Sequence, residues 1–198
     1  MNAIPMTRGA ASRGRIVEIA HQILAAEGLE RFVLREIAKR AGMQLGNLQY
    51  YFTTREDLLE AVIQVEFTNN LAAMHALEDQ ARDLEDYMKR LVQLMIQEYT
   101  GLGGRIWPVL SLLHLHNRRF REQSRAIYQE HFDTIVRAMR RYGVAGRRAE
   151  LVQKARLITA LIDGASLQAH AGPHSRDSAS WRALCRKTGE LAIAIAAG

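Results

Sequence analysis

The segment 34–55 constrains the fold more than any other part of this chain of 198 residues; it reads LREIAKRAGMQLGNLQYYFTTR. Its first eight residues repeat Leu, Ile or Ala at helical spacing, which predicts a helix with one apolar face. Gly42 then fits a reversal out of that helix, because glycine adopts a positive φ without steric cost. Leu48 and Phe52, one helical turn apart, would anchor a second short helix to the first. The pattern predicts a helix-turn-helix.

The rest of the second helix consists of uncharged hydrogen-bonding and aromatic side chains, and no acidic residue lies between positions 43 and 54. Such a surface suits a helix that binds DNA. Taken singly, Tyr50, Tyr51 and Arg55 have an alternative interpretation as an aromatic packing pair beside a helix-start arginine. Their register with Gly42 favours DNA contact.

The stretch GMQLGNLQYYFTTREDLL resembles the TetR family pattern, in which a Gly-apolar turn leads through x-x-Gly-x-Leu-x-x-Tyr-Phe to a basic residue and a Leu-Leu pair. Gly28 and the segment 34–38 resemble that family's second helix and its entry, and the close match covers roughly residues 15–60. The resemblance implies phosphate contacts by Tyr51 and Arg55, with Asn47 helping. It implies base contacts by Leu45, Gly46 and Gln49, with Gln44 as a further candidate. The expected DNA-binding residues are Arg35, Gln44, Leu45, Gly46, Asn47, Gln49, Tyr50, Tyr51 and Arg55.

The sequence departs from the family at three of these positions. The family often has a hydroxyl at 44, a basic residue at 45 and Tyr at 49, where this chain has Gln44, Leu45 and Gln49. Glutamine can pair with adenine in the major groove, and a leucine can meet a thymine methyl group. The operator sequence therefore cannot be taken from relatives.

Positive charge gathers in the same region. The chain has a formal net charge of +6, and residues 1–55 carry eight basic against four acidic side chains. A polyanionic partner fits this distribution, and a solvated basic face is the alternative. One cysteine, Cys185, predicts a reducing compartment. The start lacks the apolar stretch of a secretory signal and no run reaches the ~20 residues that cross a bilayer, so we expect a cytoplasmic protein without membrane contact.

Three prolines and many Ala, Leu, Arg, Glu and Gln residues predict an all-α fold. We expect an N-terminal arm and a three-helix helix-turn-helix DNA-binding domain over 1–55. Its first helix would start near Ser12, a plausible N-cap. A larger helical effector-binding and dimerisation domain would follow over 56–198, giving about nine helices in all.

The last two expected helices, about 147–171 and 178–197, resemble the family's dimerisation helices. Residues 155–167 are apolar on more than one face, so one side can cover the chain's own core while the other needs a partner. The resemblance implies a homodimer formed by these helices. The expected interface residues are Leu151, Ala155, Ile158, Ile162, Ala165, Trp181, Leu184 and Leu191.

Aromatic, histidine and methionine residues on the central helices line either an effector pocket or a filled core, and the sequence leaves both open. The candidate pocket residues are Met95, Tyr99, Trp107, His114, Tyr128, His131 and Phe132. His114 and His116 point about 200° apart on a helix, so they do not predict a metal site. Asp163, inside an apolar helix, is either a polar anchor of the pocket or interface or a hydrogen-bonded structural group.

No phosphate-binding loop, nucleophile motif or metal-ligand cluster predicts an enzyme, and no cofactor is expected. The leading hypothesis is a homodimeric transcriptional repressor that binds a palindromic double-stranded DNA operator and is released by a small apolar or amphipathic effector. The first alternative is an effector-independent DNA-binding or architectural protein. The second, remote alternative is a helical enzyme with an incidental basic N-terminus.

Overall fold

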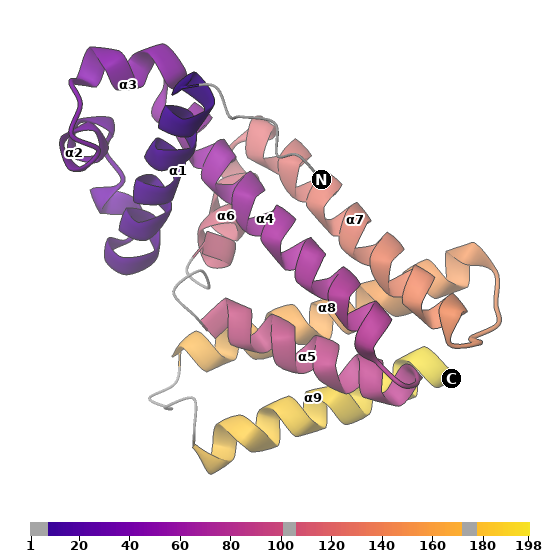
Figure 1. Ribbon diagram of the computed structural model, residues 1–198. Helices are drawn as coiled ribbons and strands as arrows, with labels where there is room; N and C mark the ends of the chain where they lie inside the picture. Colours follow the sequence, from indigo (N-terminus) through magenta and orange to yellow (C-terminus); the bar gives the residue numbers. More distant parts are fainter. Residues whose placement is uncertain (1–7, 101–105, 172–177) are drawn as a thin grey trace. The chain divides into compact units, whose positions relative to one another are not determined.

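The computed structural model describes residues 8–100, 106–171 and 178–198, with the side chains of residue 8, 98–100 and 169–171 left out. Across these ranges the chain is helical without strands, which confirms the predicted all-α fold (Figure 1). The chain divides into two compact units, Met1–Glu66 and Phe67–Gly198, which we call the N-terminal unit and the C-terminal unit. The helices are α1 (Arg8–Glu27), α2 (Leu34–Arg40), α3 (Leu45–Tyr51), α4 (Arg55–Gln80), α5 (Leu84–Thr100), α6 (Ile106–His116), α7 (Arg118–Arg141), α8 (Arg148–Ala171) and α9 (Ala179–Ala197), with a 3-10 turn η1 (Leu29–Arg31).

The turn between α2 and α3 follows the predicted geometry. Gly42 has φ 69°, and its N–H donates to the carbonyl of Lys39 at 3.1 Å. The N–H of Met43 donates to the carbonyl of Ala38 at 3.0 Å. This pair of bonds is the Schellman motif, which satisfies the last carbonyls of a helix and turns the chain sharply. It fixes the direction in which α3 leaves α2.

The core of the N-terminal unit joins α1, α2 and α3 with the first part of α4. Leu48 and Phe52 are 0% and 2% exposed, so the two predicted anchors of α3 are buried. From α1, Ile16, Ile23 and Leu24 are buried as well. His21 on α1 and Glu66 on α4 form a 2.8 Å hydrogen bond that joins the two helices within this unit. α3 is thus held from one side, and its other side is free to face outward.

Two helix starts in this unit differ in how well the sequence predicts them. α1 begins at Arg8, one turn before the expected start, so Ser12 lies inside the helix and the N-cap prediction for it is wrong. The alanines at positions 10 and 11 are strong helix formers and extend the helix backward. α4 is capped by Thr54, whose hydroxyl accepts from the Asp57 N–H at 3.1 Å while the Asp57 carboxylate accepts from the Thr54 N–H at 2.8 Å. This reciprocal arrangement is a capping box, which stabilises a helix start.

The C-terminal unit is built on α5, α7, α8 and α9. α5 packs against α8 and α9, and α7 packs against α6 and α8 (Figure 1). α8 and α9 are antiparallel neighbours, and the Lys154 ammonium donates to the carbonyl of Ala196 at 3.0 Å. The buried side chains of this core come from every one of these helices. No helix of the described ranges combines the length and apolar character that a membrane span requires.

Candidate nucleic-acid interface

The outward face of α3 carries several of the residues that the sequence assigns to base contacts. Of these, Gln44, Gly46 and Gln49 are exposed and Leu45 is half-buried. Tyr50, expected to contact DNA, is exposed as well. Tyr50 is 84% exposed, which is unusual for a large aromatic side chain. Because Leu48 and Phe52 fix the opposite face in the core, these side chains stand on a rigid element. α3 therefore offers amide groups and an aromatic ring to a partner outside the chain.

Gly46 is the second residue of α3, and no contact or backbone conformation within the protein requires a glycine at this position. A Cβ built there meets no atom within 4 Å, and the backbone does not have a positive φ. Glycine inside a helix costs about 1 kcal/mol relative to alanine. A glycine on an exposed face leaves room for the close approach of another molecule, since a side chain would keep that molecule further away. The position suits a helix that lies close against a DNA groove.

A hollow of about 250 Å³ lies beside α3 and is lined by Ser12, Met43, Asn47, Tyr50 and Tyr51. The two tyrosine rings stand edge to face, with centroids 5.2 Å apart. Sequence reasoning did not assign Ser12 to this surface, because it interpreted Ser12 as the N-cap of the first helix. The hollow gathers hydroxyl and amide groups, the kinds of side chain that bond to phosphate oxygens.

Arg55 differs from the expected phosphate ligand. Its Nε donates to the carbonyl of Phe32 at 2.7 Å, and its Nη2 donates to the carbonyl of Leu29 at 2.6 Å. The guanidinium also stands 5.9 Å from the centroid of the Phe32 ring. These contacts tie the start of α4 to the chain that enters α2. Sequence spacing could not reveal them, because the partners are backbone carbonyls more than twenty residues away.

The basic residues of α2 have two different surroundings. Arg40 is bound to Glu27 of α1, with Nη2 to Oε2 at 3.0 Å, and to Glu36, with Nε to Oε1 at 2.9 Å. The hydrogen bond from Arg40 lowers the pKa of the Glu27 carboxyl. Arg35 and Lys39 are exposed on the same helix. Arg40 thus links α1 to α2, and the exposed pair provides positive charge for a partner.

In the C-terminal unit, three of the expected pocket residues come together around Asn70, which the sequence did not single out. The Asn70 carbonyl oxygen lies 3.1 Å from His131 Nε2, and the Asn70 amide donates to the Met95 sulfur at 3.5 Å. The Trp107 and His131 rings have centroids 5.8 Å apart. On the part of α4 in this unit, Phe67 brings its ring to 5.4 Å from His131. The result is a buried aromatic cluster with one histidine at its centre.

His131 is 1% exposed and its Nδ1 has no hydrogen-bond partner. Burial lowers the pKa of His131 to about 4, so the imidazole is neutral at pH 7. A buried polar atom without a partner costs free energy. This cost makes the Nδ1 atom of His131 a candidate contact for a bound molecule.

The remaining pocket candidates have other partners. Tyr128 stacks on Phe132 at 5.9 Å and donates its hydroxyl to Asp163 at 2.8 Å. Burial and this carboxylate raise the pKa of Tyr128. His114 shares a 3.3 Å hydrogen bond with the hydroxyl of Ser124. The Tyr99 side chain lies outside the described residues. In the described part of the chain no three His, Cys, Asp or Glu side chains converge on a metal site.

Most of the expected dimer-interface residues lie inside the protomer. Leu184 is half-buried and Leu191 is 53% exposed. The other six expected residues are at most 8% exposed and fill the core of the C-terminal unit: Leu151, Ala155, Ile158, Ile162, Ala165 and Trp181. The outer side of α8 instead exposes Leu157 and Leu167, at 58% and 61%. α8 is apolar on two sides, as predicted. Most of the residues that the sequence assigned to the dimer interface, however, lie on the side that faces the protomer's own core.

A helix-turn-helix with an exposed uncharged reading face and basic surroundings defines a DNA-binding protein of the helix-turn-helix class. The comparisons with known proteins specify it further. The protein-family model described as bacterial regulatory proteins, tetR family, matches residues 16–62. The model described as BetI-type transcriptional repressor, C-terminal, matches residues 105–191. The chain belongs to the TetR family of bacterial transcriptional regulators, whose members are not enzymes.

A curated relative is an HTH-type transcriptional regulator of Staphylococcus aureus (strain bovine RF122 / ET3-1), 30% identical over 126 residues. The match covers 62% of this chain and 64% of that protein, so the chain spans less than two thirds of the length of the curated relatives it matches. A regulator of the same class from Staphylococcus aureus (strain USA300) is 28% identical over 122 residues, again 62% of this chain and 64% of that protein.

Solved structures share the fold over nearly the whole chain. A transcriptional regulator from Saccharomonospora viridis, solved in complex with choline, has a TM-score of 0.73 at 22% identity, covering 92% of this chain and 95% of that one. A TetR-family regulator from Rhodococcus sp. has a TM-score of 0.75 at 18% identity, covering 94% and 98%. At these identities the likeness establishes the fold.

Proposed function

We propose that this chain is a homodimeric, ligand-responsive repressor that places α3 of each protomer in a major groove of a palindromic operator. The observation that carries this proposal is the exposed face of α3. On this face Gly46, which has no side chain, lies between the exposed Gln44 and Gln49. Amide side chains pair with adenine edges, and the missing side chain allows close approach. Two-fold symmetry gives half-site centres about one helical turn apart, ~34–36 Å.

The proposed phosphate contacts surround this reading face. Asn47 and Tyr51 line the hollow beside α3 together with Ser12. Arg35 on α2 is exposed and adds a positive charge. Such contacts hold the protein in register on the duplex, while the base contacts select the sequence. Arg55 supports this surface from within, through its bonds to Leu29 and Phe32.

We propose the outer side of α8 as the dimer interface, in place of the buried residues that the sequence suggested. Ala160 and Gly164 are exposed between Leu157 and Leu167. Small residues between two exposed leucines let a second helix approach closely. Leu191 on α9, which packs against α8, is a further exposed leucine, at 53%. An isologous contact between two copies would cover these leucines from water.

The proposed effector site is the cluster around His131. Its walls are the rings of Phe67 and Trp107, and its unsatisfied group is the Nδ1 atom of His131. A small amphipathic molecule with one hydrogen-bonding group meets both features. Choline, found in the Saccharomonospora viridis regulator, is such a molecule, and aromatic faces also attract its quaternary ammonium group. The effector would release DNA by binding more tightly to a conformation in which the two α3 helices of the dimer have a spacing that does not fit the operator.

Selection of bound sites from a random duplex pool at physiological salt tests the DNA-binding proposal. We expect enrichment of a palindrome whose half-site centres lie about one helical turn apart. A pool without enrichment, combined with weak and strongly salt-dependent binding, would contradict a sequence-specific repressor. It would favour an architectural DNA-binding protein instead. The Gln49→Ala variant in the same selection should change the base preference at one position of each half-site.

Thermal unfolding with a panel of small amphipathic compounds, choline among them, tests the effector proposal. A compound that binds the folded state raises the melting temperature, and the rise grows with the logarithm of its concentration relative to its Kd. We expect at least one compound to do so in the wild type and to lose this effect in the His131→Phe variant. The same compound should release the selected operator. Stabilisation that is unchanged in His131→Phe would place the site elsewhere.

A further inference from the structure

The two ring nitrogens of His131 have different surroundings, and the difference determines which of them carries the proton. Nε2 lies 3.1 Å from the side-chain oxygen of Asn70, and both residues are buried. An amide oxygen has lone pairs and no proton, so it can only accept a hydrogen bond. Nε2 therefore carries the proton and donates it to Asn70.

A second contact supports this orientation of the Asn70 amide. Its nitrogen donates to the Met95 sulfur at 3.5 Å, and a thioether sulfur has no proton to donate in return. If the amide were turned over, its oxygen would face the sulfur, and two acceptors would oppose each other. The Met95 contact therefore helps to keep the amide oxygen directed at His131.

The other ring nitrogen, Nδ1, is left with a lone pair and no proton. Because burial lowers the pKa of His131 to about 4, the ring carries a single proton at pH 7, and Nε2 holds it. Among the residues that the structure describes, Nδ1 has no hydrogen-bond partner in either role. His131 is therefore a buried acceptor that lacks a donor.

The rings around this acceptor suit an apolar or aromatic body. The Phe67 and Trp107 rings have centroids 5.4 and 5.8 Å from that of His131. Burial is the cause of the lowered pKa of His131, and no charge in the described part of the chain contributes to it. A molecule in this cluster would therefore meet aromatic faces and, at Nδ1, one polar atom that needs a proton donor.

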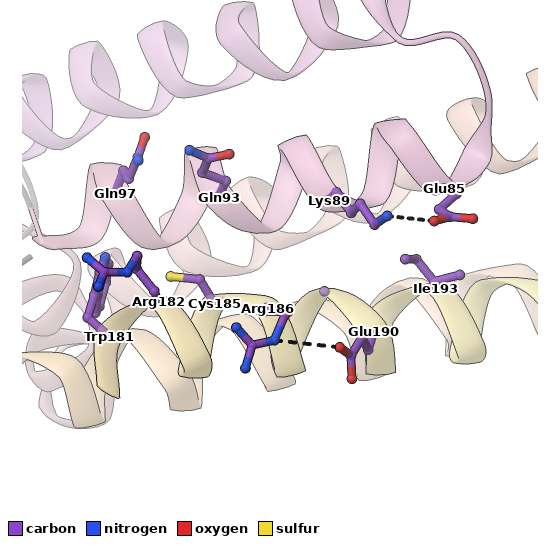
Figure 2. Close-up of a pocket in the computed structure, with 11 residues that line it drawn as sticks. Glu85, Lys89, Gln93, Gln97, Trp181, Arg182, Cys185, Arg186, Glu190 and Ile193 are labelled. Atoms are coloured by element: carbon purple, nitrogen blue, oxygen red, sulfur yellow. Dashed lines mark hydrogen bonds and ion pairs between the residues drawn. The ribbon is translucent and has the colours of Figure 1, made fainter. Parts of the chain in front are cut away.

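A groove of about 720 Å³ between α5 and α9 is a different place in the same unit, and His131 does not line it (Figure 2). Charged side chains of this groove pair with one another. The Lys89 ammonium contacts the Glu85 carboxylate at 2.6 Å, and Arg186 contacts Glu190 at 3.9 Å. These groups satisfy each other, whereas Nδ1 of His131 has no partner. The requirement for a donor is therefore a property of the His131 cluster.

We propose that the effector carries a hydroxyl or N–H group on an apolar or aromatic body, and that Nδ1 of His131 accepts the hydrogen bond from this group. The inference rests on the effector site proposed above and specifies its chemistry. Ethers, aldehydes, ketones and carboxylates direct lone pairs at the lone pair of Nδ1, so the site selects against them. Asn70 is the positioning residue, because it keeps the proton on Nε2.

Nitrogen NMR of the full ¹⁵N-labelled chain at pH 7 tests the position of the proton without any ligand. The sequence has seven histidines, and the His131→Gln variant identifies the signals of His131 by their absence. We expect the chemical shift of a protonated nitrogen for Nε2 and that of a bare nitrogen for Nδ1. A protonated Nδ1 would overturn the inference, because the site would then require an acceptor, and it would leave the effector site itself in place.

Three probes of one shape test the selectivity by calorimetric titration of the full chain. Indole, benzofuran and indene share a fused two-ring body and differ at one position, which is N–H, oxygen or CH₂. We expect indole to bind about tenfold more tightly than benzofuran, because benzofuran leaves Nδ1 without a donor. Indole should also shift the Nδ1 signal of His131. Equal affinities of indole and benzofuran would overturn the donor requirement.

Two variants separate failure of this inference from failure of the effector site. Indole should lose its affinity in His131→Phe; unchanged binding there, or no binding of the three probes to the wild type, would overturn the site and this inference with it. Asn70→Leu removes the oxygen that keeps the proton on Nε2, so the preference for indole over benzofuran should disappear. A preference retained in Asn70→Leu would overturn the role of Asn70. His75→Gln, at another histidine of the same unit, is the control and should retain the preference. The melting temperature checks folding, and the NMR measurement on the wild type needs no variant at Asn70.

Discussion

The Arg55 guanidinium donates a 2.7 Å hydrogen bond to the carbonyl of Phe32, and the same group bonds Leu29 at 2.6 Å. Arg55 is the first residue of α4, and the two carbonyls precede α2. The Leu29 carbonyl also accepts from the Phe32 N–H at 3.2 Å, the bond that closes η1. Arg55 therefore positions the entry to the helix-turn-helix from inside the N-terminal unit.

Replacement of Arg55 by alanine should destabilise the N-terminal unit by about 1.5–3 kcal/mol, the range for hydrogen bonds to a charged group. DNA affinity should fall with stability. The slope of log affinity against log salt should stay near the wild-type value, because no phosphate contact is removed. Urea unfolding and binding titrations at several salt concentrations measure these effects.

Arg35→Ala is the matched control, since it removes one exposed arginine of the proposed contact surface. Its stability should change little, and its salt slope should fall by about 0.9, the value for one phosphate contact. If Arg55→Ala lowered the slope by the same amount without loss of stability, Arg55 would be a phosphate ligand after all.

Gly46→Ala should affect stability and DNA binding in opposite directions. The added methyl group meets no atom within 4 Å, and alanine favours the helix by about 1 kcal/mol. The melting temperature should therefore rise. Operator binding should weaken, because the methyl group occupies space that we assign to the DNA. A variant that is more stable and binds as well as the wild type would argue against close approach at Gly46.

Comparison of Tyr87 with Tyr142 measures the free energy that a buried hydroxyl costs when it has no hydrogen-bond partner. The Tyr87 hydroxyl is buried without a hydrogen-bond partner, and burial raises its pKa. The Tyr142 hydroxyl bonds the carbonyls of Glu78 and Ala81, at 2.9 and 3.1 Å. Tyr87→Phe should leave stability unchanged or raise it, and Tyr142→Phe should lower it by about 1 kcal/mol. Urea denaturation of both variants measures the difference; equal losses would imply a partner for Tyr87.

His131 should make stability depend on pH. Burial lowers its folded-state pKa from 6.5 to about 4. Well above pH 6.5 the imidazole is neutral in both states and the stability is fully present. As the pH falls from 6.5 toward 4, the unfolded state binds a proton that the folded state does not, so stability is lost. The expected loss between pH 7 and pH 5 is about 2 kcal/mol.

The His131→Gln variant isolates this effect, because the other ionisable groups are the same in both proteins. Urea unfolding at pH 7, 6 and 5 should show a weaker pH dependence in the variant than in the wild type. Parallel curves for the two proteins would mean that His131 does not titrate in this range.

The proposed dimer interface predicts a charge-sensitive surface on α8. Leu157→Glu should shift the protein toward the monomer in analytical ultracentrifugation, because a carboxylate would be buried without a partner in the interface. Leu112→Glu, at a leucine of similar exposure on α6, is the control and should leave the oligomeric state unchanged. A dimer that survives Leu157→Glu would point to another interface.

The sequence by itself determined the helices, the turn at Gly42 and the family. These features depend on local chemistry: the 3.6-residue period, the freedom of glycine at positive φ, and the short-range register of Leu48 and Phe52. The same locality explains the sequence prediction that α8 is apolar on two sides. In each case the physical cause lies within a few residues of the feature.

Only the tertiary structure decided which atoms meet. It placed Ile158 and Ile162 inside the protomer and left Leu157 and Leu167 outside, because the direction of the core depends on how α5 and α9 pack against α8. It gave Arg55 two carbonyl partners and joined Asn70 to His131 across sixty-one positions. Such contacts depend on the packing of distant segments, and a helical period specifies which residues share a face without specifying what that face will meet.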